Sequence, residues 1–120
     1  MNFQAFFIVG LGGMFGSMAR YLIGYIFRSS SFPIATLLVN FSGSLLIGFL
    51  MAKHGKQLFQ EDWRLFLVVG FCGGFTTLSA LSFENLQYLQ SGKYFLLAAY
   101  SLLTVVGGLI LAVGGYYLGK

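Results

Sequence analysis

A glycine-rich stretch with clustered hydroxyl side chains, residues 70–84, lies inside a long apolar run. Gly73 and Gly74 are adjacent, and glycine is a poor helix former. Four hydroxyl residues follow them: Thr76, Thr77, Ser79 and Ser82. Backbone that leaves the helix inside a bilayer must find new partners because lipid supplies none, and its freed carbonyls and hydroxyls can meet an ion or water. The stretch therefore predicts a broken transmembrane helix that builds an ion site.

Polar side chains also occur in pairs at helical spacing within the apolar runs. The pairs are Thr36 with Asn40, Ser79 with Ser82, and Tyr100 with Thr104. Members of a pair share a helix face, so the pairs predict one file of N–H and O–H donors without a carboxylate, which suits a small, strongly hydrated anion. For each hydroxyl the alternative is a bond back to the carbonyl at i−4. For Asn40, the alternative to an ion is a bond between helices.

Charged residues are rare, at 8% of 120 residues. Arg20 lies within the first run, where it either reaches the membrane interface or draws anions to a vestibule. Glu84 closes the third run, either as a solvated helix end or paired with a basic residue.

Cys72 is expected to be a small core residue. One histidine and no acidic cluster give no catalytic or zinc constellation, so we do not expect an enzyme.

Four apolar runs, each near the ~20 residues that a spanning helix needs, must position these groups. With 58% hydrophobic residues, the chain is predicted to be an all-α membrane protein, with residues 1–120 forming a single four-helix transmembrane domain. The helices are expected at residues 3–27, 32–52, 65–90 and 94–119. Three G-x-x-x-G pairs, Gly12 with Gly16, Gly70 with Gly74, and Gly115 with Gly119, allow close helix contacts within the chain or between copies.

The distribution of Lys and Arg gives almost no preference for one membrane orientation. Four crossings place both termini and the 53–64 connection on one side. That side carries Lys53, Lys56, Arg64 and Lys120, and the other carries Arg20, Arg28 and Lys93. Because the Lys/Arg bias orients a membrane protein, this balance predicts insertion in both directions and an antiparallel dimer. A second subunit would also complete a conduit that four helices are too few to enclose.

Three segments, residues 12–21, 35–48 and 70–84, together resemble the CrcB/Fluc family of fluoride channels. The resemblance covers essentially the whole chain. It implies a dual-topology dimer with two pores in a prokaryotic cell membrane, and passive fluoride export that protects the cytoplasm. It also implies a structural Na⁺ at the dimer centre, held by the backbone carbonyls of Gly73 and Thr76. The implied pore residues are Asn40, Ser79 and Ser82, with Thr36, Tyr100 and Thr104 as an aligned track. No nucleic-acid partner is expected.

Leu78 and Leu81 stand where the family usually has phenylalanines whose electropositive ring edges face the ion. We therefore hypothesise that a paralogous partner supplies these rings, which would make the chain one half of a heterodimer or a non-conducting subunit. A small proton-coupled multidrug exporter is a further alternative. It needs an acidic residue within the membrane, and the first three-quarters of every predicted helix lacks one.

Overall fold

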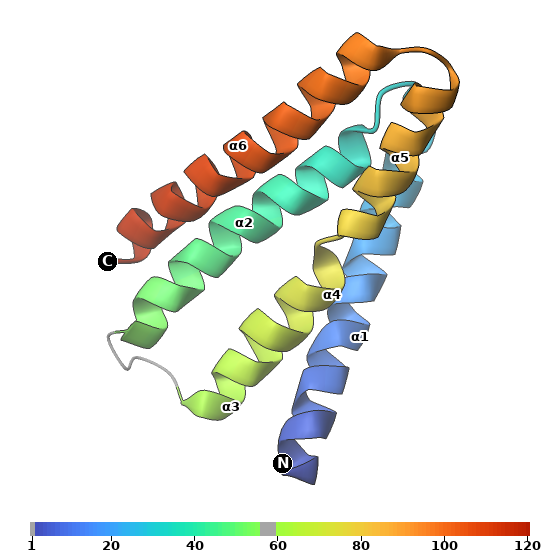
Figure 1. Cartoon of the computed structure of the whole chain (residues 1–120). Helices are drawn as coiled ribbons and strands as arrows, with labels where there is room; N and C mark the ends of the chain where they lie inside the picture. Colours follow the sequence, from blue (N-terminus) through green and yellow to red (C-terminus); the bar gives the residue numbers. More distant parts are fainter. Residues whose placement is uncertain (1, 56–59) are drawn as a thin grey trace.

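The computed structural model describes residues 2–55 and 60–120, and its helices are long and apolar enough to cross a membrane four times (Figure 1). The four crossings confirm the all-α class. Three crossings are single helices: α1 (Phe3–Ile26), α2 (Ile34–Gly55) and α6 (Tyr94–Gly119). The other crossing consists of α3 (Glu61–Arg64), η1 (Leu65–Cys72), α4 (Gly73–Phe75) and α5 (Leu78–Gln90).

The helix ends differ from the expected ones by a few residues. α2 begins at Ile34, after Pro33, whose carbonyl accepts the N–H of Leu37 at 3.2 Å. The same helix runs three residues beyond the expected end, to Gly55. The third crossing begins at Glu61 rather than 65, because its polar first turn is closed by the ion pair of Glu61 and Arg64. Lys56, counted above in the charge balance, lies outside the described residues.

The helices pack as two pairs, α2 against α6 and α1 against η1 and α4 (Figure 1). Glycines make both contacts close. A Cβ on Gly16 would overlap the carbonyl oxygen of Phe71, and one on Gly48 would overlap that of Ala112. The three G-x-x-x-G pairs all face a neighbouring helix of the same chain. These backbone contacts fix where the third crossing lies relative to α1 and where α6 lies relative to α2.

Few side chains are fully buried, because the outer faces of α1 and α6 carry large apolar groups such as Phe3 and Phe95. The core includes Val39, Tyr100 and Cys72. Cys72 is 2% exposed, as expected for a small core residue. The exposed faces have the composition that lipid or another subunit would cover.

Candidate functional site

The third crossing is broken at Thr76 and Thr77, which confirms the prediction for the glycine-rich stretch. Both residues are extended, with φ −79° and ψ 156° at Thr76, and φ −151° and ψ 118° at Thr77. The chain turns helical again at Leu78, because the Thr77 hydroxyl caps α5 by accepting the N–H of Ala80 at 3.1 Å. The π-helix η1 lies just before the break, separated from it by α4, and π-helical segments are often found at functional sites.

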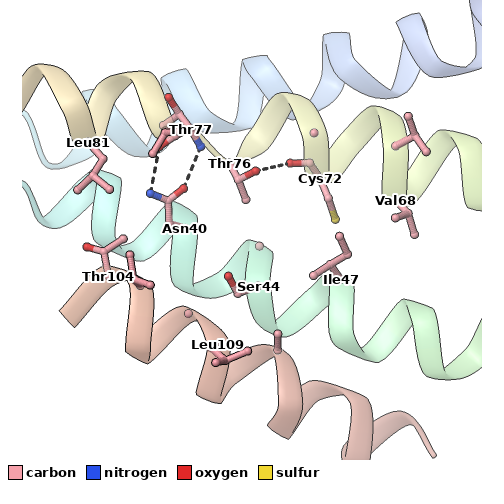
Figure 2. Close-up of a pocket in the computed structure, with 17 residues that line it drawn as sticks. Asn40, Ser44, Ile47, Val68, Cys72, Thr76, Thr77, Leu81, Thr104 and Leu109 are labelled. Atoms are coloured by element: carbon pink, nitrogen blue, oxygen red, sulfur yellow. Dashed lines mark hydrogen bonds between the residues drawn. The ribbon is translucent and has the colours of Figure 1, made fainter. Parts of the chain in front are cut away.

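The Asn40 amide holds the break open from α2 (Figure 2). Its Nδ2 donates to the Thr77 carbonyl at 3.2 Å, and its Oδ1 accepts the Thr77 N–H at 2.9 Å. One side chain thus satisfies both backbone groups of an extended residue that cannot turn to water. Asn40 therefore makes the bond between helices that the sequence left as an alternative. It also lines the groove described below.

The other freed carbonyls of the break have lost their helical donors. In a continuous helix the Thr77 N–H would bond the Gly73 carbonyl, but it bonds Asn40 instead. The Ala80 N–H would bond the Thr76 carbonyl, but it bonds the Thr77 hydroxyl. The two carbonyls predicted to face Na⁺ are thus among those that the break releases.

Arg20 is bound to the break rather than only reaching the interface. Its Nε donates to the Gly74 carbonyl at 3.1 Å, at the negative end of the short helix α4. Arg20 also lines a cavity of about 600 Å³ between α1, α2 and α5, together with Arg28 and Thr36. One guanidinium therefore both bonds the break and lines a cavity, and its role in drawing anions to a vestibule stays a prediction.

A groove of about 710 Å³ runs between α2, the broken crossing and α6 (Figure 2). Its polar lining includes Asn40, Thr77 and Thr104. The Thr104 hydroxyl donates back to the carbonyl one turn earlier in α6, at 2.8 Å. Leu81 is 7% exposed within the groove, whereas Leu78 is 75% exposed at its rim. The two leucines thus occupy different environments in the single chain.

The expectation of a donor file without a carboxylate is wrong, because Glu84 lies within it. Its Oε2 accepts the Thr36 hydroxyl at 2.8 Å, and its Oε1 accepts the Tyr100 hydroxyl at 2.9 Å. Neither expected role of Glu84 holds, since its described partners are two hydroxyls. The spacing in the sequence could have indicated this position. Glu84 is three residues after Leu81, so both lie on the face of α5 that points inward.

Ser79 and Ser82 do not line the groove with the other predicted residues. Both side chains are exposed in the single chain, and the Ser79 hydroxyl lies 3.1 Å from that of Thr77. The structure therefore brings together four of the six paired residues, Asn40 with Thr104 and Thr36 with Tyr100.

Replacing Tyr100 by phenylalanine is expected to lower the free energy of unfolding by about 1–3 kcal/mol, because the Glu84 carboxylate loses a buried donor. The ring itself, which packs against Phe32 and Tyr88, is retained. Thermal unfolding in detergent would measure the change. The control is Tyr94→Phe, an exposed tyrosine at the start of the same helix. Equal stability of the two variants would contradict a stabilising Tyr100–Glu84 bond.

Comparison with known proteins identifies the family of the chain. The family model described as "CrcB-like protein, Camphor Resistance (CrcB)" matches residues 7–116. A protein of Leptospira interrogans named fluoride-specific ion channel FluC is 42% identical, covering 100% of this chain and 98% of its own length. FluC of Azobacteroides pseudotrichonymphae is 38% identical, covering 93% of each chain. FluC of Thermus thermophilus is 41% identical, covering 99% of this chain and 96% of its own. With its four crossings, the chain is a multi-pass protein of a prokaryotic cell membrane, and it belongs to the CrcB/FluC family.

Proposed function

We propose that the chain is a subunit of a fluoride-specific ion channel, which lets fluoride leave the cytoplasm passively and so lowers its toxicity. The observation that carries this proposal is the break at Thr76 and Thr77, held open by Asn40 beside a groove. N–H and O–H donors at membrane depth can replace the hydration shell of a small anion. The names of the relatives, fluoride-specific ion channel FluC, identify fluoride as the ion.

We propose that a second subunit closes the groove in an antiparallel dimer. The rim exposes Leu78 (75%), Val105 (66%) and Leu109 (66%). An ion path cannot be left open to lipid tails, which offer it no partner. The near balance of Lys and Arg between the two ends supports opposite insertion of the two subunits. Lipid would then cover the apolar faces that remain exposed.

We propose that the carbonyls of Gly73 and Thr76 hold a structural Na⁺ between the two copies. Na⁺ is a hard cation that takes oxygen ligands, and these carbonyls have lost their helical N–H donors. A Cβ at Gly73 would meet no atom of the described chain within 4 Å, so another copy can approach there. The ion would supply positive charge that compensates the carbonyl dipoles of both breaks.

A second candidate, a partner subunit of a heterodimeric channel, is favoured by one observation. Leu78 is exposed at the groove rim, where the family usually presents a phenylalanine. Leucine has no ring quadrupole with an electropositive edge to offer an anion. In this arrangement the paralogue would supply the aromatic rings, and this chain would supply the break, Asn40 and the groove.

Fluoride efflux from liposomes distinguishes the two candidates. The chain reconstituted alone is expected to release fluoride and to exclude chloride. Leu78→Phe is expected to raise the rate, because it adds a ring edge at the rim. Flux that appears only after a paralogous subunit is added would support the heterodimer, while no fluoride flux with or without it would overturn the channel proposal. Empty liposomes are the baseline.

A further inference from the structure

A small polar cavity of about 200 Å³ lies beside the α1–α2 connection, at the end of the bundle that we call the loop end. It is separate from the groove and from the cavity beside Arg20. It is lined by Ser30, Ser31, Phe32 and Pro33 of the α1–α2 connection and by Glu84, Gln87 and Tyr88 of α5. Within this lining, only Glu84 also belongs to the set of hydrogen bonds described above. The cavity therefore adjoins the site through one carboxylate.

Glu84 and its two donors lie between this cavity and the groove. Glu84, Thr36 and Tyr100 form what we call the carboxylate set. On each of three helices, a residue that lines the groove lies one turn away from a member of this set. The steps are Asn40 to Thr36 on α2, Leu81 to Glu84 on α5, and Thr104 to Tyr100 on α6. The carboxylate set thus separates the membrane-depth groove from the loop end.

Aromatic rings fill the space around this separation. The ring of Phe32 lies edge-on to Tyr100 at 5.5 Å between centroids, and the ring of Tyr88 does so at 6.3 Å. Tyr100 is consequently only 1% exposed. These rings cover Tyr100, whereas Glu84 itself lines the cavity. The carboxylate can therefore be reached through the cavity from the α1–α2 connection.

An anion that reaches the Thr36 and Tyr100 hydroxyls must take the two O–H donors that Glu84 now uses. A carboxylate that loses both donors needs others, since burying an unpaired charge is costly. The cavity offers hydroxyls on Ser30 and Ser31 and an amide on Gln87. A move of the carboxylate into the cavity would leave the two hydroxyls to the anion and reduce charge repulsion.

We propose that this cavity is the loop-side mouth of the anion pathway, where Ser30, Ser31 and Gln87 receive the Glu84 carboxylate while the anion occupies the Thr36 and Tyr100 hydroxyls. The inference rests on the proposed channel function. It assigns a role to the α1–α2 connection, which takes no part in the broken helix or in the groove.

Labelling of an introduced cysteine tests the mouth. Ser31→Cys lines the cavity, and the control Ser91→Cys is exposed in the α5–α6 connection at the same end of the bundle (Figure 1). Purified protein is treated with sulfonatoethyl methanethiosulfonate, its label is located by mass spectrometry, and it is reconstituted for fluoride efflux. Native Cys72 is buried. Labelled Ser31→Cys is expected to lose at least about tenfold in rate, because the label fills the mouth with negative charge, while labelled Ser91→Cys keeps its rate.

A second measurement needs no conduction. If the anion drives the carboxylate into the cavity, sodium fluoride is expected to slow labelling of Ser31→Cys, whereas sodium chloride at the same ionic strength is not. The labelling rate of Ser91→Cys is expected to be the same in both salts. Full efflux from labelled Ser31→Cys, or labelling indifferent to fluoride, would overturn the mouth. If the unlabelled protein shows no efflux with or without a paralogous subunit, the channel function fails, and the labelling rates alone decide whether fluoride reaches this site.

Discussion

Replacing Asn40 by leucine is expected to lower the free energy of unfolding by roughly 2–6 kcal/mol and to abolish fluoride efflux. The change removes both hydrogen bonds to Thr77. The N–H and the carbonyl of Thr77 are then left without their partner, at a cost of about 1–3 kcal/mol each. Leucine has the same number and branching of side-chain heavy atoms as asparagine, so lost packing contributes little to this effect.

The measurement is unfolding in detergent followed by the fluorescence of Trp63, together with efflux from liposomes. The matched control is Ser42→Ala on the same helix, because the exposed Ser42 hydroxyl bonds back only to carbonyls of its own helix, those of Leu38 at 2.6 Å and Val39 at 3.3 Å. If Asn40→Leu matched Ser42→Ala in both measurements, Asn40 would not be holding the break.

Replacing Gly16 by valine is expected to cost about 3 kcal/mol or more of stability and to abolish efflux. A Cβ at this position would overlap the carbonyl oxygen of Phe71 and lie 2.9 Å from the backbone nitrogen of Phe75. Overpacking usually costs 1–3 kcal/mol where side chains can shift, but these obstacles are backbone atoms. α1 must then move away from η1 and α4, which would also break the bond from Arg20 to Gly74.

Gly10→Val is the control for this change, since Gly10 lies on the same helix and a Cβ there meets no atom of the described chain within 4 Å. Both variants lose a helical glycine for the same β-branched residue, so the intrinsic helix preference is matched. The two melting temperatures in detergent are compared. Similar values would show that the close approach of α1 to the break is not needed for stability.

The features that could be predicted from the sequence are those that depend on local composition. Run length and apolarity indicate four crossings, because a bilayer has a fixed thickness and lipid cannot satisfy free backbone groups. Adjacent Gly73 and Gly74 followed by Thr76 and Thr77 indicate a break, since weak helix formers there meet competing hydroxyls. Asn40 could be singled out for a similar reason, because an amide at membrane depth must have a partner.

The partners themselves were decided only by the tertiary structure. Periodicity shows which residues of one helix share a face, but not which face of another helix it meets. Glu84 therefore looked like the end of an apolar run, yet α5 turns it between Thr36 and Tyr100. Ser79 and Ser82 share a face that points away from the groove of the single chain. The rotation and depth of each helix are set by backbone contacts at glycines such as Gly16 and Gly48, and these long-range contacts determine which polar groups lie within hydrogen-bonding distance.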